Sequence, residues 1–295
     1  MVKIAVENTP KMSGPSHGGQ CNLPRAGILA EGQGWSVFDV VCTAGRHDRC
    51  FEEQHSQTSI AVVVSGTFHY STSTGQELMS PGSLLLGNGG DSFACSHEHG
   101  VGDRCVSFHY SDDFCDELPA RSMRQSFRIP RIPAIRELSP LTTRVAALLR
   151  SGVDRAIFQE VALDVIDRAI YLQHGLSARQ QASDPSSLAR ITRVLRSMEA
   201  DPAAPHALSD LAAEARLSPY HFLRCFEAVT GETPHQYLRR LRLRRAAMLL
   251  KEESARVPTR ILDIALDCGF GDVSNFNRAF RAEFGQNPRA YRHCA

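Results

Sequence analysis

Residues 269–292 read GFGDVSNFNRAFRAEFGQNPRAYR, and this stretch carries the start signal, the buried face and the stop signal of a short helix. Asp272 is suited to cap the first turn of that helix, because its side chain can accept a hydrogen bond from a free backbone N–H. Phe276 and Phe280 lie four residues apart, so both fall on one face. Gly285 is suited to the left-handed conformation that commonly ends a helix. The stretch therefore predicts a short helix with an aromatic buried face.

A second short helix is predicted just upstream, over residues 261–267, with Gly269 in the turn between the two. Two short helices joined by a tight turn form a helix-turn-helix. The same pattern occurs 54 residues earlier, where residues 208–215 precede a helix that begins with Ser218 and Pro219, an N-cap followed by a proline suited to the first helical position. The matched pairs are Phe226 and Phe280, Gly231 and Gly285, Pro234 and Pro288, and Tyr237 and Tyr291. An internal duplication with these spacings predicts two helix-turn-helix motifs.

Between the two copies, Pro234–Lys251 has the pattern of one longer helix, about 27 Å long at 1.5 Å per residue. A rod of that length can hold two recognition helices near the ~34 Å repeat of one DNA turn. Five arginines lie on this helix at positions 239, 240, 242, 244 and 245. We expect them to contact phosphates and to form ion pairs within the protein, since backbone contacts give affinity and register but little sequence choice.

The charge of the chain is divided unevenly, which the formal net charge of +1 over 295 residues conceals. Residues 187–295 hold 17 basic and 12 acidic side chains, whereas residues 1–186 hold 16 basic and 20 acidic ones. The C-terminal third is thus the part suited to bind a polyanion.

The stretch 269–292 resembles the C-terminal signature of the AraC/XylS family of transcription regulators, and the resemblance extends over about residues 188–293. It implies a double-stranded promoter operator as the partner, RNA polymerase as a further one, and an N-terminal cupin-like β-barrel that senses an effector. Carried over by position, the base-facing residues are Tyr220, Leu223, Arg224, Val273, Ser274, Asn277 and Arg278. Arginine can bind guanine through two hydrogen bonds, and asparagine can do the same with adenine. For Arg224 and Arg278 a phosphate contact or a structural role is the alternative.

The N-terminal part has a different pattern. Short apolar runs at 60–64, 67–70 and 83–86 alternate with Gly, Pro, Ser and Asn clusters, which is typical of an antiparallel β-sandwich or barrel. Residues 144–173 follow as an amphipathic helical stretch, either a core stripe of the same domain or a dimerisation helix. We therefore predict an α+β chain with a cupin-like sensing domain at 1–176, a polar linker at 177–187 and an all-α DNA-binding domain at 188–295.

Cysteines and histidines concentrate near residue 100. Alternation along a strand would place Cys95, His97 and His99 on one face, and a hairpin through Gly100 and Gly102 would bring a facing strand with Cys105 beside them. Thiolate and imidazole groups suit Zn²⁺ or another borderline-soft divalent ion. Cys95, His97, His99 and Cys105 are therefore the candidate metal ligands, and His47, Cys50 and His55 could add to them. Redox-active thiols, ordinary core residues and a polar effector pocket are the alternatives.

The sequence has no apolar run near the ~20 residues of a membrane-spanning helix, and its first residues lack the apolar stretch of a signal peptide. Nine cysteines without framework spacing favour reduced thiols. We expect a cytoplasmic, homodimeric, non-enzymatic regulator of transcription controlled by a signal at its N-terminal domain. The alternatives are a cupin-type metal-dependent enzyme fused to a DNA-binding module, and a regulator without a small-molecule effector.

Overall fold

A computed structural model describes residues 24–44, 51–73, 75–97, 102–117, 126–149, 153–176, 185–252 and 259–293. The chain divides into two units. Unit 1 comprises Met1–Pro133 and Leu148–Ala182, and unit 2 comprises Ala134–Ala147 and Ser183–Ala295.

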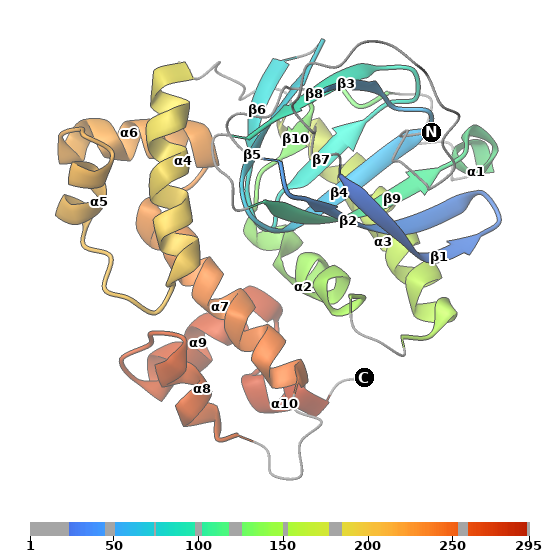
Figure 1. Ribbon diagram of the computed structural model, residues 1–295. Coiled ribbons are helices and arrows are strands. Elements are labelled where there is room, and N and C mark those ends of the chain that lie inside the picture. Colours follow the sequence, from blue (N-terminus) through green and yellow to red (C-terminus); the bar gives the residue numbers. More distant parts are fainter. Residues whose placement is uncertain are drawn as a thin grey trace. The chain divides into compact units, whose positions relative to one another are not determined.

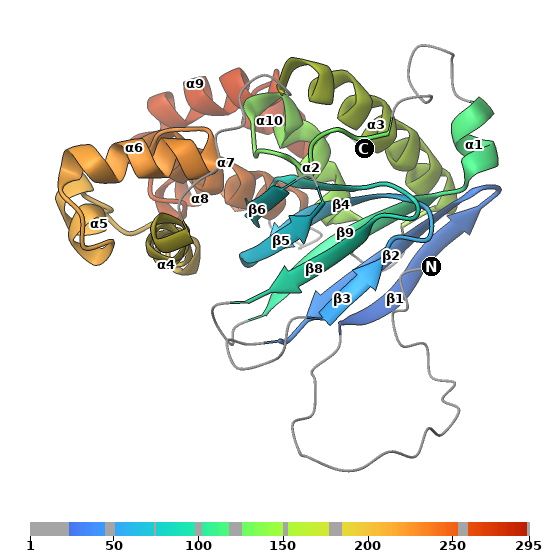
Figure 2. The ribbon, with the colours of Figure 1, turned by 90° about the horizontal axis from the view of Figure 1, so that it is seen from above.

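Unit 1 is built on two antiparallel sheets (Figure 2). The six-stranded sheet has the order β1 (Arg25–Gly32), β2 (Trp35–Cys42), β9 (Asp103–Tyr110), β4 (Thr58–Ser65), β7 (Leu84–Gly87) and β10 (Arg131–Ile132). The four-stranded sheet has the order β3 (Phe51–Gln54), β8 (Ser92–Ser96), β5 (Phe68–Thr72) and β6 (Gly75–Met79). The predicted runs at 60–64, 67–70 and 83–86 correspond to β4, β5 and β7, so the prediction of a β-rich domain is confirmed.

The two sheets pack against each other through an apolar core. One cluster joins Val63 and Leu85 of the larger sheet to Phe68, Tyr70 and Met79 of the smaller one. In the part of the chain that the structure describes, strand pairing stays within each sheet, so the sheets form an open sandwich and not a closed barrel.

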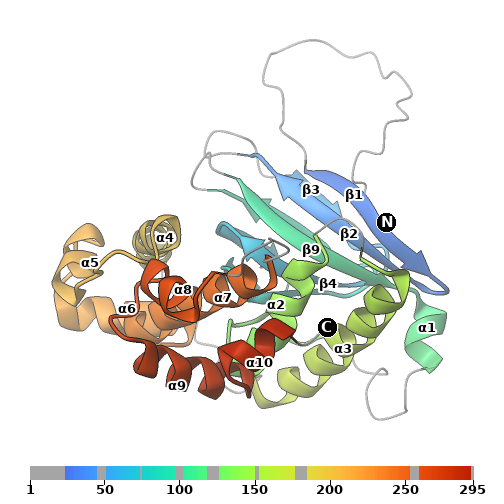
Figure 3. The same ribbon diagram turned by 90° about the horizontal axis from the view of Figure 1, so that it is seen from below.

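Helix α3 (Arg155–Leu176) covers unit 1 on the larger sheet, where it contacts β1, β2, β4 and β10 (Figure 3). Val161, Val165 and Ile166 of the predicted apolar stripe are fully buried, whereas Ile157 at its start is 41% exposed. Tyr110 Oη donates a hydrogen bond of 2.7 Å to the carbonyl of Ala162 and ties α3 to β9. The stripe is therefore core from Val161 onward, and Ile157 is not part of that core. The other helix of the unit, α1, spans Asp112–Glu117.

Unit 2 is all-helical (Figure 1). Its main helices are α4 (Pro185–Ala200), α5 (Leu208–Glu214), α6 (Pro219–Thr230), α7 (Pro234–Glu252), α8 (Ile261–Asp267), α9 (Val273–Phe284) and α10 (Pro288–His293). The predicted helices of both copies and the long helix between them are confirmed. No helix among the described residues is both long and apolar enough to cross a membrane.

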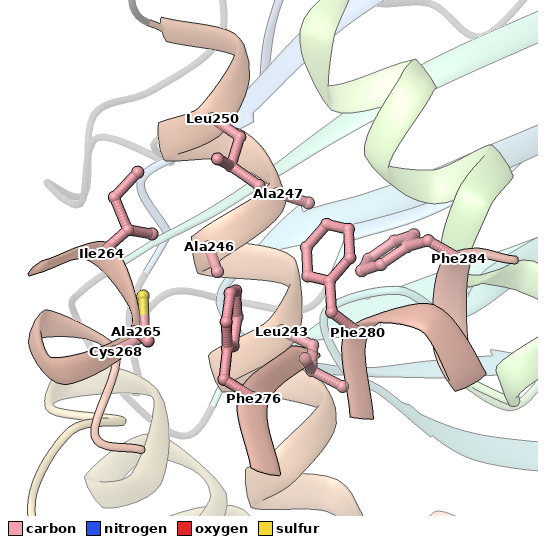
Figure 4. Packing of buried hydrophobic residues seen from close by; sticks show 10 residues of the cluster. All are labelled: Leu243, Ala246, Ala247, Leu250, Ile264, Ala265, Cys268, Phe276, Phe280 and Phe284. Carbon is pink, nitrogen blue, oxygen red and sulfur yellow. The ribbon is translucent and has the colours of Figure 1, made fainter. Parts of the chain in front are cut away.

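The duplication seen in the sequence is also a duplication of packing. Phe226 meets Tyr237 edge to face with ring centroids 5.7 Å apart, and Phe280 meets Tyr291 in the same way at 5.3 Å. In the second copy, Phe276 and Phe280 lie with Leu243 and its neighbours on α7 in one buried cluster (Figure 4). In the first copy the Phe226–Tyr237 pair fixes α6 to α7, and in the second copy the Phe280–Tyr291 pair fixes α9 to α10.

The observed division of the chain differs from the predicted one in one segment. The short helix η1 (Arg136–Leu138) and helix α2 (Ser139–Ala147) lie in the predicted sensing domain, yet they belong to unit 2, where α2 contacts α7 and α9. Of the predicted linker, residues 177–184 lie outside the described residues, and 185–187 already form the first turn of α4. Pro185 at the start of α4 is suited to that position, because its missing N–H would be unpaired there in any case.

Candidate functional site

Helix α6 is the second helix of the first helix-turn-helix motif. The Ser218 side chain accepts a hydrogen bond from the backbone N–H of His221 at 3.4 Å, and Pro219 follows it at the first helical position. Phe222 and Phe226 are fully buried, and Gly231 ends the helix with a φ of 84°. These anchors fix which face of α6 is turned outward.

The three residues predicted to face DNA bases lie on the outer side of α6. Tyr220 is 70% exposed, Arg224 is exposed and Leu223 is half-buried. The Arg224 guanidinium lies 3.4 Å from the Tyr220 hydroxyl, so the two side chains form one polar patch. An exposed guanidinium beside a phenol can donate hydrogen bonds to base edges or phosphates.

Helix α9 repeats this arrangement. The Asp272 side chain accepts a hydrogen bond of 2.7 Å from the backbone N–H of Asn275, and Gly285 ends the helix with a φ of 76°. Phe276 and Phe280 are fully buried below it. The packing thus turns the opposite face of α9 to solvent.

The four predicted base-facing residues of α9 fall on or near that outer face. Ser274, Asn277 and Arg278 are exposed, and Val273 is half-buried. Arg278 donates a hydrogen bond of 2.7 Å to the side chain of Asn275, which gives it a partner on its own helix. The remaining donors of Arg278 and the amide of Asn277 lie on the exposed face.

The arginine run on α7 separates into inward and outward members. Arg240 lies 2.6 Å from the Glu232 carboxylate and 3.1 Å from that of Glu283. Burial lowers the pKa of Arg244, and two of its guanidinium nitrogens have no exposed surface. Arg242 is half-buried. Contacts within the protein thus account for Arg240 among the five arginines.

Arg242 joins two loops that are far apart in the sequence. Its guanidinium donates to the carbonyls of Pro202 at 2.6 Å, Ala204 at 2.9 Å and Gly269 at 2.9 Å. Gly269 has a φ of 84°, and a Cβ there would lie 2.8 Å from the backbone of Ala203. The loop before α5 and the turn of the second motif are therefore held together by one side chain.

Arg239 and Arg245 remain exposed on α7. Neither takes part in the ion pairs that Arg240 forms with Glu232 and Glu283, and both can contact a polyanion that approaches from solvent. They are the members of the run suited to phosphate contact.

A buried carboxylate pair connects α2 to the C-terminal helices. Ser139 at the start of α2 donates a hydrogen bond to Glu283 of α9, which also pairs with Arg240. Burial raises the pKa of Glu232 to about 7, against the opposing effect of Arg240. Such a cluster costs desolvation and is stabilising only when complete.

Unit 1 contains a cavity of about 100 Å³ between its sheets. Cys95 of β8 and Cys105 of β9 line it, as does His97, which follows β8. His99, His47 and Cys50 lie outside the described residues. Burial raises the pKa of the Cys105 thiol well above its ordinary value.

The predicted hairpin between the Cys95 and Cys105 strands is wrong. β8 pairs with β3 and β5 in the smaller sheet, whereas β9 pairs with β2 and β4 in the larger one. Gly102, directly before β9, has a φ of 78°. Cys95 and Cys105 still meet at the cavity, but across the sandwich.

Sequence reasoning missed Cys42 and Asp103. Both line the cavity, and their donor atoms and that of His97 all lie within 4.8 Å of one another. Asp103 could have been found, because it precedes Cys105 by two residues and shares its strand face. Cys42 is brought there by the register of β2 and β9, which a local pattern does not specify.

The three groups are in close contact. His97 Nε2 lies 2.6 Å from Asp103 Oδ2. Burial lowers the pKa of His97, but hydrogen bonds to Asp103 and Cys42 outweigh it and raise the pKa to about 9.

A second polar network lines the same cavity. The His55 ring bonds Tyr70 at 2.7 Å through Nε2 and Ser59 at 2.9 Å through Nδ1. Burial, with His109 adding to it, lowers the pKa of His55 to about 4, so this ring is neutral at pH 7. The part of the cavity wall around His55 therefore offers neutral hydrogen-bonding groups.

Comparison with known proteins places the similarity in unit 2. Residues 211–293 match the family described as a helix-turn-helix domain. The HTH-type transcriptional activator RhaS of Klebsiella pneumoniae (strain 342) is 38% identical over 104 residues, which is 35% of this chain and 36% of that protein. The right origin-binding protein of Escherichia coli (strain K12) is 40% identical over 89 residues, 30% of this chain and 29% of that protein. The chain thus spans about a third of the length of these curated relatives.

A solved structure of a transcriptional regulator from Chromobacterium violaceum, described as an AraC-type DNA-binding domain-containing protein, is 31% identical. It covers 37% of this chain and 94% of its own, with a TM-score of 0.33.

Proposed function

The C-terminal unit makes this chain a member of the AraC/XylS family, and from this premise we propose that the whole protein is a sequence-specific DNA-binding transcription regulator. The observation that carries the proposal is the repeated presentation of an outward helix face. In both α6 and α9, buried phenylalanines hold the helix while polar side chains suited to base edges point to solvent. Double-stranded DNA is the partner that two such faces fit.

The geometry of unit 2 suits two successive major grooves. Helix α7 has 19 residues, which corresponds to about 28 Å, and it connects the two motifs (Figure 1). One DNA turn is ~34 Å, so α6 and α9 can read neighbouring turns on one face. The proposed base-facing residues are Tyr220, Leu223 and Arg224 on α6, and Val273, Ser274, Asn277 and Arg278 on α9. Arg239 and Arg245 supply phosphate contacts and register.

Unit 1 is the proposed sensing part. Its cavity between the sheets has neutral hydrogen-bonding groups and thiols on its wall. At about 100 Å³ it is smaller than the roughly 300–1,000 Å³ of pockets for drug-sized ligands, so the effector we propose is a much smaller molecule. In this proposal the open sandwich is a variant of the cupin-like barrel. The sensing domain is residues 1–176, the linker is 177–187 and the DNA-binding domain is 188–295. Helix α2 is the part of the sensing domain that packs on the DNA-binding domain. The protein acts in the cytoplasm with RNA polymerase and is not an enzyme.

Homodimerisation is a further part of the proposal, with α3 as the contact. Ile157, Leu163 and Tyr171 are 41%, 40% and 73% exposed. At 3.6 residues per turn the three fall within an arc of about 120° on the helix. Sedimentation of the full-length protein tests this: a Leu163→Glu and Tyr171→Glu double variant should be monomeric where the parent is dimeric, and equal sedimentation of the two would contradict it.

DNA binding is tested with fragments selected from genomic DNA by the full-length protein. Arg224→Ala should weaken binding to a selected fragment by about 1–3 kcal/mol and binding to random DNA much less, in mobility shifts at fixed salt. Arg193→Ala removes the same charge from an exposed position on α4 and is the matched control. Equal losses on selected and random DNA would reduce Arg224 to a phosphate contact, and failure to select any fragment would refute the proposed function.

A further inference from the structure

Three groups able to ligate a metal meet at one end of the cavity in unit 1. Cys42 ends β2, His97 follows β8 and Asp103 begins β9. One donor atom from each lies within 4.8 Å of the other two, and the three residues are only 4%, 8% and 8% exposed. A thiol, an imidazole and a carboxylate therefore converge in a site shielded from bulk water.

The fold holds these groups in place from both sheets. Cys42 and Asp103 are directly opposed in the β2–β9 pair, while His97 directly follows β8 of the smaller sheet. The His97 ring stacks on Phe68 with centroids 5.9 Å apart. A Cβ on Gly102 would lie 2.4 Å from the carbonyl oxygen of Cys42, so only glycine permits the close backbone approach beside the site.

We propose that Cys42, His97 and Asp103 form a binding site for a zinc-class divalent cation, with a fourth coordination position facing the cavity. Borderline-soft divalent ions favour mixed sulfur, nitrogen and oxygen donors of this kind. Three protein ligands with one open position are the pattern of zinc sites that keep a bound water or accept a small ligand.

The chemistry of the site suits a cation better than apolar packing. Asp103 has the His97 ring as its partner when no ion is bound, and a divalent cation would displace the proton held between these two groups. The thiols of Cys95 and Cys105 line the same cavity, so the open position faces further soft donors. To admit an ion, the contact of 2.6 Å between His97 Nε2 and Asp103 Oδ2 must widen. The two atoms would then lie about 3.3 Å apart, as tetrahedral bonds near 2.0–2.1 Å require.

The site differs from the one that the sequence predicts. His97 is common to both, Cys42 and Asp103 stand in place of Cys95 and Cys105, and the predicted ligand His99 lies outside the described residues. All three residues belong to unit 1, so ion binding at this site can be measured without DNA.

Cobalt titration of the metal-free full-length protein tests the inference. Co²⁺ bound to a thiolate in tetrahedral geometry gives a thiolate-to-cobalt charge-transfer band and intense visible absorption. We expect both signals to saturate at about one ion per chain and to disappear on addition of Zn²⁺, which binds such sites more tightly than Co²⁺. A folded parent protein without the charge-transfer band would overturn the proposal.

Variants assign the signal to the site. Cys42→Ala should abolish the charge-transfer band, and Asp103→Asn should lower the affinity for Co²⁺ by at least tenfold. Cys115→Ala is the matched control, since Cys115 is a buried thiol of the same unit that does not line the cavity, and it should retain the parent signal. The fluorescence of Trp35, on the same strand as Cys42, reports whether each variant is folded. An unchanged band and affinity in folded Cys42→Ala or Asp103→Asn would place the ion elsewhere and refute the site.

Discussion

Replacing Arg242 by alanine removes the side chain that holds two distant loops of unit 2 together. Three of its hydrogen bonds, to the carbonyls of Pro202, Ala204 and Gly269, measure 2.6, 2.9 and 2.9 Å. All three acceptors are backbone groups, two in the loop before the first helix-turn-helix motif and one in the turn of the second. We expect the variant to be less stable and to bind DNA more weakly at both half-sites.

The size of the effect follows from these contacts. A hydrogen bond from a charged donor contributes about 1.5–3 kcal/mol, so three contribute about 4.5 kcal/mol at the lower end. Because Arg242 is half-buried, water can reach some of the vacated carbonyls, which reduces the loss to about 2–4 kcal/mol. Arg242→Lys should recover less than half of it, because an ammonium group lacks the planar fork that reaches several carbonyls.

The assay is urea unfolding of the full-length protein followed by helical circular dichroism, which reports mainly on unit 2. Arg239→Ala is the control, since Arg239 is an exposed arginine of the same helix. The free energy of unfolding of this variant should lie within about 0.5 kcal/mol of the parent value. The steepness with which log affinity for DNA falls with log salt should decrease by about 1. Equal unfolding midpoints for Arg242→Ala and Arg239→Ala would refute the reasoning.

Three further perturbations have expected outcomes. Phe280→Ala removes a fully buried ring whose centroid lies 4.5 Å from that of Phe284, so it should cost unit 2 about 3–5 kcal/mol in the same assay; a loss under 1 kcal/mol would show that this cluster is not the core. Tyr110→Phe removes the hydroxyl that bonds the Ala162 carbonyl of α3, so it should lower the stability of unit 1 by about 0.5–1.5 kcal/mol, measured by the fluorescence of the single tryptophan; no change would contradict a structural role for that bond. Burial lowers the pKa of His55 and His109 to about 4 from 6.5, so the unfolded chain binds protons that the folded chain does not between pH 6.5 and 4. The free energy of unfolding of unit 1 should therefore fall as the pH drops through this window. At pH 4.5 the two histidines together should lower it by about 5 kcal/mol relative to pH 7, and a free energy that does not change with pH would argue against buried neutral imidazoles.

The C-terminal unit was largely predictable because its signals are local. Helix caps at Ser218 and Asp272, left-handed glycines and phenylalanines four residues apart depend on neighbours within one or two turns. The pattern therefore specified both motifs and the helix between them. It did not separate Arg242, which binds loop carbonyls, from Arg239, which is exposed, because that depends on contacts distant in sequence.

The N-terminal unit was predictable in class but not in pairing. Alternation identified strands, yet the partner of each strand is set by packing of residues far apart in the chain. The hairpin expected between Cys95 and Cys105 is replaced by strands in two sheets. Cys42 enters the site only through its register with Asp103, a non-local fact. Likewise, α2 joins unit 2 through the contact of Ser139 with Glu283.

A footprint of the full-length protein on a selected DNA fragment tests the central claim most directly. Two recognition helices on one rod predict two protected major-groove segments about one helical turn apart on one face of the DNA. Arg224→Ala should remove protection from one segment and Asn277→Ala from the other. Protection of a single segment, or protection unaffected by either variant, would contradict DNA recognition by two helix-turn-helix motifs.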